Sequence, residues 1–170
     1  MTASTPRFVR CCSRRQWLGR ALGLLALGVP VAAAGVAGLP ESFDPARDAK
    51  TDLALACRLA AESGRRVIVD VGGEWCPWCH VMDRFFERRP DLRALRDARF
   101  VWLKINYSKA NPNPQLLSGW PKVAGYPHLF VLDAKGALLH SQDTSALEDG
   151  DDYNAAAVRR FLTRWAAPGR

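Results

Sequence analysis

The stretch RVIVDVGGEWCPWCH, residues 66–80, decides the fold. Residues 66–71 are compact and mostly β-branched, which is typical of a buried strand, and two glycines follow it. From residue 77 to about residue 89 apolar side chains recur at helical spacing, so an amphipathic helix is expected there. The sequence therefore places two cysteines, Cys76 and Cys79, at a junction between a buried strand and a helix.

β-branched apolar runs, typical of strands, and apolar residues at helical spacing predict the other elements. They indicate a helix over 48–63, a short helical turn over 91–98, strands over 100–105 and 129–132, a mostly loop segment over 108–122, a hairpin return over 137–140, an acidic loop over 148–152 and a final helix over about 154–165. A strand–helix–strand crossover implies parallel pairing, and the hairpin adds antiparallel strands. The expected fold class is α/β, a mixed sheet flanked by helices on both faces.

Length and composition are those of one globular domain behind a basic leader. The 170 residues are 48% hydrophobic and 24% charged, which excludes a disordered chain. The net charge of +7 invites a nucleic-acid function, but five arginines and no acidic residue lie in residues 1–40. The remainder holds 19 basic and 17 acidic residues. A nucleic-acid partner is therefore not expected.

Residues 1–37 have the pattern of an export signal. A basic segment containing Arg14-Arg15 is followed by an uncharged, Ala- and Gly-rich run from Ala21 to Leu39, with small residues near its end. The paired arginines resemble a twin-arginine signal. An ordinary export signal and a retained membrane anchor are the alternatives. We expect residues 38–47 to be a linker, residues 48–170 to form the domain, and the domain to work in the bacterial periplasm.

Three cysteines remain after this leader, and only two of them are close in sequence. Cys76 and Cys79 are three residues apart and able to close a small ring. Cys57 then has no cysteine within the domain with which to pair. Cys57 lies on the apolar face of a predicted helix, so we expect a buried, inert thiol. No second pair of cysteines or histidines has the spacing of a zinc site, so no metal is expected.

The spacing of Cys76 and Cys79 predicts a redox pair. Unpaired N–H groups and the macrodipole at a helix N-terminus favour an anion, so the thiol pKa of Cys76 is expected below its free value. Pro77 suits the first helical turn because its missing N–H is not needed there. Cys79, about one turn further on, is placed to attack a mixed disulfide at Cys76.

The segment 67–79 resembles the active-site segment of the thioredoxin superfamily, and the order of elements extends the likeness over roughly 48–165. The resemblance implies that Asp70 is a buried carboxylate that moves protons for Cys79, and that Lys104 lies beside it. It also implies that Tyr126-Pro127 is the cis-proline loop that faces the cysteines and binds an extended substrate strand. Asp70 as a strand-end cap, Lys104 as a solvated residue and a trans Pro127 are the alternatives.

The resemblance is to small exported proteins of the disulfide-interchange type. Trp75, next to Cys76, is a candidate for substrate contact, and a structural aromatic is the alternative. Pro77, Trp78 and His80 are candidates for tuning the redox pair, and a helix-surface residue without a role is the alternative for His80. Pro77-Trp78 replaces the Gly-Pro of thioredoxin itself, which leaves the reduction potential and the direction of electron flow open.

Two other functions compete with this hypothesis. The run Cys76-x-x-Cys79-His80 also matches c-type haem attachment, and a thioredoxin-like chain without redox activity would be a binding module. The favoured prediction is a protein-disulfide oxidoreductase, without cofactor and monomeric. Its expected partners are client protein thiols or disulfides and a membrane redox protein.

Overall fold

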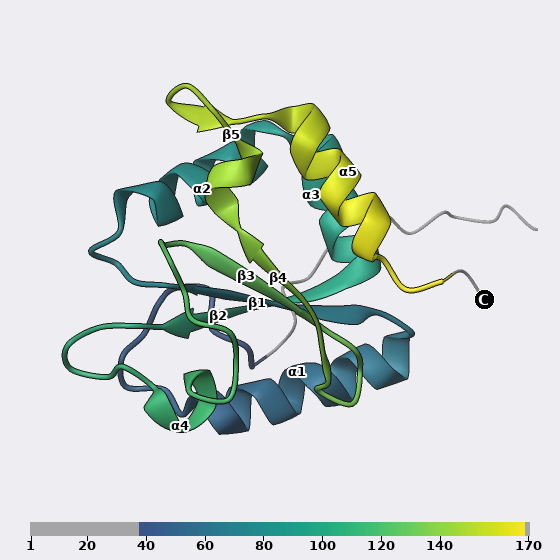
Figure 1. Cartoon of the computed structure of the whole chain (residues 1–170). Coiled ribbons are helices and arrows are strands. Elements are labelled where there is room, and N and C mark those ends of the chain that lie inside the picture. Colours follow the sequence, from purple (N-terminus) through teal and green to yellow (C-terminus); the bar gives the residue numbers. More distant parts are fainter. Residues whose placement is uncertain (1–37, 169–170) are drawn as a thin grey trace, which may run out of the picture. The chain divides into compact units, whose positions relative to one another are not determined.

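Residues 38–168 are the part of the chain that the computed structural model describes, and the leader predicted over 1–37 lies outside them. The elements are α1 (Ala49–Ser63), β1 (Arg66–Gly72), α2 (Pro77–Arg88), α3 (Pro90–Arg99), β2 (Phe100–Asn106), α4 (Pro114–Leu117), β3 (His128–Leu132), β4 (Leu138–Asp143), the 3-10 turn η1 (Thr144–Leu147), β5 (Glu148–Asp149), β6 (Asp152–Tyr153) and α5 (Ala155–Trp165) (Figure 1).

Four strands form one mixed sheet in the order β2-β1-β3-β4. β1 and β2 are parallel, with Asp70 paired to Lys104, whereas β3 is antiparallel to both β1 and β4. The strand–helix–strand crossover and the hairpin therefore pair as the sequence predicts. The α/β fold class, a thioredoxin-like mixed sheet, is confirmed.

Helices cover both faces of this sheet, and the alternation along β1 divides the core between them. Val67, Val69 and Val71 pack with α1 in one buried cluster. Ile68 belongs to a second cluster with side chains of α2, α3 and α5. Figure 1 shows α1 on one side of the sheet and these three helices on the other. Asp70 has the same parity as Ile68, so its side chain lies on the α2 face.

The ends of α1 match the sequence signals. Asp48 caps the first turn, its carboxylate accepting the N–H of Thr51, and Gly64 ends the helix in the left-handed region at φ 69°.

Two segments hold more regular structure than the sequence indicates. The turn expected after residue 90 is the ten-residue helix α3, because Pro90 stands at its first turn, where a missing N–H costs nothing. The acidic segment expected to be a loop contains the short antiparallel pair of β5 and β6.

Residues 38–47, expected to be a linker, are folded against the domain. Phe43 is 1% exposed, and its N–H donates to Oε1 of Glu74 at 2.8 Å. We call residues 38–47 the N-terminal strap. Within residues 38–168 no helix combines the length and the apolar character needed to cross a membrane.

The cap of α5 offers a test of the fold. The side chain of Asn154 accepts the N–H groups of Ala156 and Ala157, each at 3.0 Å. We expect Asn154→Ala to lower the free energy of unfolding by about 1 kcal/mol, because two N–H groups lose their acceptor. Asn154→Ser, which keeps an acceptor, is the control. Equal losses for both variants in urea denaturation would contradict this role of the cap.

Candidate redox site at the start of α2

Cys76 is the N-cap of α2, and this position forms the site. After β1 the chain turns so that the N–H of Cys76 donates to the carbonyl of Gly73 at 2.9 Å. The N–H of Cys79 then donates to Sγ of Cys76 at 3.1 Å. The two cysteines form a disulfide, with Cα atoms 5.3 Å apart. A sulfur therefore takes the place that a Ser, Thr or Asp side chain often takes at a helix N-cap.

The neighbours of the pair hold the first turn of α2 in place. Pro77 begins the helix, as predicted, without leaving an N–H unpaired. Trp78 is half-buried, and its ring makes an edge contact with Tyr153, with centroids 5.5 Å apart. Cys79 faces inward with the apolar residues of α2 and is 1% exposed.

A glycine makes room for the inner sulfur. A Cβ atom on Gly72 would collide with Sγ of Cys79 and would come within 3.0 Å of Cζ of Phe43. The end of β1 therefore has no space for any side chain below the disulfide. The sulfur of Cys79 and the ring of Phe43 both pack against this glycine.

Asp70 is a buried carboxylate on the face of the sheet that α2 covers. It is 1% exposed, and its Oδ1 has no hydrogen-bond partner. Burial raises the pKa of Asp70 to about 7, against the opposing effect of the Lys104 charge. At neutral pH such a group is able both to take up and to release a proton. Asp70 lies inside β1 and its Oδ1 accepts no N–H group, so the strand-end cap does not describe it.

Lys104 lies beside Asp70 in the sheet, but its ammonium group is bound elsewhere. Its Nζ contacts both carboxylate oxygens of Asp83, at 2.7 and 2.6 Å. The side chain of Lys104 is 9% exposed and that of Asp83 38%, so the pair lies at the edge of the core. Lys104 is thus not a solvated strand residue, and it links β2 to α2 below the disulfide.

An aromatic group lies on the outer side of the pair. Trp75 is 54% exposed, and its indole N–H donates to the carbonyl of Tyr107 at 2.7 Å. The ring of Tyr126 contacts Trp75 edge-on and stacks on Tyr107, with centroids 5.4 and 4.8 Å apart. The Tyr126–Pro127 peptide bond is cis, as the resemblance implies, and burial raises the pKa of the Tyr126 hydroxyl.

His80 is tied to the loop that precedes the cysteines. Its Nε2 lies 2.9 Å from the carbonyl oxygen of Glu74 and 3.8 Å from Oε2 of the same residue. The imidazole therefore braces the turn that carries Cys76. An effect of His80 on the reactivity of the pair stays a prediction.

The structure brings together the predicted residues at one end of the sheet and adds four that sequence reasoning missed. The additional residues are Phe43, Glu74, Asp83 and Tyr107. Asp83 carries a usable signal, because it lies four residues after Cys79 and so on the same side of the helix. Phe43 carries none, because nothing in residues 38–47 marks one apolar side chain as buried.

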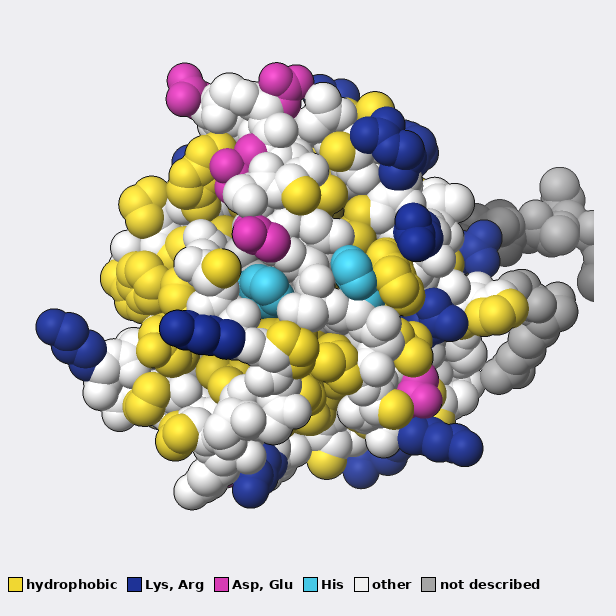
Figure 2. Space-filling view, viewed as in Figure 1, with side chains coloured by type: hydrophobic (Ala, Val, Ile, Leu, Met, Phe, Trp, Pro, Cys, Tyr) yellow, Lys and Arg dark blue, Asp and Glu magenta, His cyan; other side chains and the backbone are white. Residues whose placement is uncertain are grey.

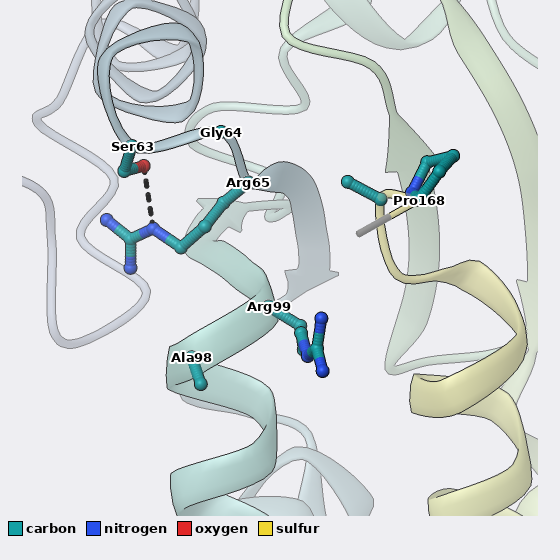
Figure 3. Close-up of a pocket in the computed structure, with 7 residues that line it drawn as sticks. Ser63, Gly64, Arg65, Ala98, Arg99 and Pro168 are labelled. Atoms are coloured by element: carbon teal, nitrogen blue, oxygen red, sulfur yellow. Dashed lines mark hydrogen bonds between the residues drawn. The ribbon is translucent and has the colours of Figure 1, made fainter. Parts of the chain in front are cut away.

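Cys57 and the surface pocket lie away from these residues. Cys57 is free and half-buried, not fully buried as expected, and burial raises the pKa of its thiol. The pocket in Figure 3 lies before β1, between Gly64, Arg99 and Pro168, whereas the cysteines follow the other end of that strand. The Arg65 guanidinium there donates to the carbonyls of Asp97 and Phe100, at 2.9 and 3.3 Å. The pocket is thus lined by the ends of α1 and α3 and by residues that follow α5.

Charged groups do not converge on a metal in the described part of the chain. No cluster of three or more His, Cys, Asp or Glu side chains with the geometry of a metal site occurs in residues 38–168. In the view of Figure 2, acidic side chains gather at the top, over β5, and Lys and Arg side chains are scattered along the edges.

The profile of a family described as thioredoxin-like matches residues 48–134. The chain belongs to this thioredoxin-like family.

The segments that match curated relatives make up only part of the length of those relatives. A thiol:disulfide interchange protein DsbD from a Pseudomonas species is 30% identical over 129 residues, 74% of this chain and 21% of the relative. The protein of the same name from Pseudomonas fluorescens is 29% identical over 107 residues, 62% of this chain and 17% of the relative. The chain thus spans about a fifth of the length of these relatives.

A solved structure shares the fold. The disulphide isomerase from Xylella fastidiosa superposes with a TM-score of 0.62 and 19% identity, over 75% of this chain and 97% of that chain. At this level of identity the likeness shows the architecture.

The burial of Asp70 predicts a pH-dependent cost in stability. The folded chain holds a proton on Asp70 up to about pH 7, whereas an unfolded chain releases it near its ordinary pKa of 3.8. Stability due to this group is therefore present at low pH and is lost as the pH rises toward and through 7. We expect Asp70→Asn, which never ionises, to gain stability relative to the unaltered chain between pH 5 and pH 8, by on the order of 1–4 kcal/mol. A difference in urea denaturation that stays constant with pH would contradict a raised pKa at Asp70.

Proposed function

We propose that this chain is a thiol–disulfide oxidoreductase that exchanges disulfides with client proteins through Cys76 and Cys79. The observation that carries the proposal is the disulfide at the N-terminus of α2, the helix that packs on the face of the sheet where the carboxyl group of Asp70 is buried. The relatives named for thiol:disulfide interchange support the same chemistry.

Exchange proceeds in two balanced steps. A partner thiolate attacks Sγ of Cys76, and the Cys76–Cys79 bond breaks. Cys76 is then joined to the partner in a mixed disulfide, and Cys79 is released as a thiolate. A second partner thiolate attacks the partner sulfur of this mixed disulfide and releases Cys76. Two electrons pass to the protein, and the partner leaves as a disulfide. The reverse sequence oxidises a partner, and the relative potentials of the two pairs set the direction.

Asp70 supplies the proton that this cycle needs. With a pKa of about 7 it is protonated in part of the molecules at neutral pH, and it gives that proton to the thiolate of Cys79 as the disulfide opens. In the reverse direction the carboxylate takes the proton from Cys79. Lys104 and its partner Asp83 set the charge around this exchange, so we place Lys104 as a positioning residue.

The aromatic group and the cis-proline loop form the proposed client-binding side. Trp75, the most exposed large apolar side chain at the site, stands next to Cys76. Pro127 precedes β3, whose first residue pairs with Val71 near the end of β1. An extended client segment beside Pro127 would reach the sulfurs and gain backbone hydrogen bonds.

We further propose that the protein works in the periplasm after export on the leader at 1–37. A membrane redox protein would return the pair to its starting state after each turnover. This assignment rests on the sequence of the leader, with its Arg14-Arg15 pair and its uncharged run.

Trapping of a mixed disulfide tests the proposed exchange. In a Cys57→Ala background, Cys79→Ala leaves Cys76 without the thiol that resolves its mixed disulfides. We expect this variant to accumulate disulfide-linked adducts with client proteins on non-reducing gels, and a matched Cys76→Ala variant to accumulate none. The chain with both active-site cysteines should reduce insulin. Absence of adducts together with absence of insulin reduction would leave only a binding function.

A further inference from the structure

The redox pair is enclosed, although exchange requires an incoming sulfur to touch it. Cys76 is 2% exposed and Cys79 is 1% exposed. Attack on a disulfide needs direct approach of a thiolate to one of the two sulfur atoms. Some side chain that covers the pair therefore has to move before a partner protein reacts.

Phe43 of the N-terminal strap packs against the pair, and it comes from a segment that precedes the sheet and helices. It forms one buried cluster with Cys76 and Cys79, against which Trp78 and Tyr126 also pack. Its ring tip and the sulfur of Cys79 both lie within 3.0 Å of the position that a Cβ atom on Gly72 would take, so the absence of a side chain at Gly72 lets both pack there.

The position of the ring also shields the charges below the pair. Nζ of Lys104 lies 4.5 Å from the centroid of Phe43, and Phe43 itself is 1% exposed. A cation over an aromatic face is attracted to it, and more strongly where water is excluded. Removal of the ring would admit water to Lys104 and to the space beside Cys79.

Polar contacts hold the strap, and they lie near the surface. The N–H of Phe43 donates to Oε1 of Glu74 at 2.8 Å, and Nδ2 of Asn111 donates to the carbonyl of Pro45 at 2.9 Å. Arg47 pairs with Asp52 at the start of α1 and donates to the carbonyl of Gly38 at 2.8 Å. One such hydrogen bond changes an equilibrium constant by roughly two- to tenfold. A few of them are broken far more readily than the sheet unfolds.

We propose that the N-terminal strap controls access to the disulfide and that Phe43 is its access-determining residue. The inference rests on the proposed exchange function. It adds that the strap determines which partner proteins reach the disulfide. With the strap closed, Phe43 blocks the approach of a bulky thiol. When the Phe43 ring is displaced, the space that it occupied is an apolar pocket. The favoured partner is therefore a protein segment that fills this pocket with an apolar side chain of its own.

Two thiols of different size test this proposal without any client. In the Cys57→Ala full chain, the oxidised pair is reduced by 2-mercaptoethanol or by glutathione, and the thiols formed are counted by alkylation and mass spectrometry over time. We expect Phe43→Ala to accelerate reduction by glutathione about tenfold and reduction by 2-mercaptoethanol clearly less. Phe43→Leu, which keeps an apolar side chain, should retain most of the discrimination between the two thiols.

A second pair of variants separates release of the strap from loss of the ring. Glu74→Ala removes the acceptor for the N–H of Phe43, and Glu74→Gln keeps an oxygen there; both remove the same charge near His80. We expect Glu74→Ala to accelerate reduction by glutathione about threefold or more, and Glu74→Gln to react like the parent chain. This comparison holds even if Phe43→Ala fails to fold.

Two results would overturn the proposal. Unchanged rates in both Phe43→Ala and Glu74→Ala would show that the strap does not limit access. Equal acceleration with both thiols would show that Phe43 alters the disulfide itself and not the approach to it. Because these rates need no client, a failure here is distinguishable from a failure to trap mixed disulfides with Cys79→Ala.

Discussion

The sulfur of Cys76 accepts the N–H of Cys79 in the first turn of α2, and the other features of the site depend on this cap. The cap fixes Cys76 at the helix N-terminus, where N–H dipoles converge on the sulfur. It also fixes the distance to Cys79, because one helical turn separates the two residues. Pro77 stabilises the same turn at no cost in hydrogen bonds. Chemistry and local folding thus use the same two residues.

The buried charges below the disulfide make this arrangement responsive to pH. Asp70 has no hydrogen-bond partner for Oδ1, and its pKa is raised to about 7 chiefly by burial. The ammonium group of Lys104, which would hold that pKa down by direct pairing, is bound to Asp83 instead. Because the lysine is shared in this way, the carboxyl group keeps a pKa close to neutral. At neutral pH this carboxyl group is therefore able both to release and to take up a proton.

Local signals allowed most of the fold to be predicted from the sequence. The β-branched run of β1, the helical stripe of α2 and the turn at Asp133–Gly136 each specify an element through nearby residues. The sequence predicts only a short turn where α3 lies, because a proline ends one helix as readily as it begins the next. The pair of β5 and β6 lies in a run of acidic residues that has no strand periodicity, so its pairing depends on tertiary contacts.

The site was predictable where a residue's role is tied to its spacing from the cysteines. Cys76 and Cys79 are paired, and Asp70 is buried, as the resemblance implies. The Tyr126–Pro127 peptide bond is cis, and Tyr126 packs against the cluster that contains the two cysteines. The partner of Lys104 and the burial of Phe43 were not predicted. Both depend on contacts between segments distant in sequence, and a single apolar residue in a polar segment has no period to reveal which way it faces.

Reversible closure of the disulfide is the central claim, and a redox titration tests it most directly. The purified Cys57→Ala chain is equilibrated in a series of dithiothreitol or glutathione buffers, quenched by alkylation and weighed by mass spectrometry. The account predicts one two-electron transition in which each molecule carries either no alkyl group or two. A large population with a single alkyl group, or a failure to form the disulfide under oxidising conditions, would contradict it.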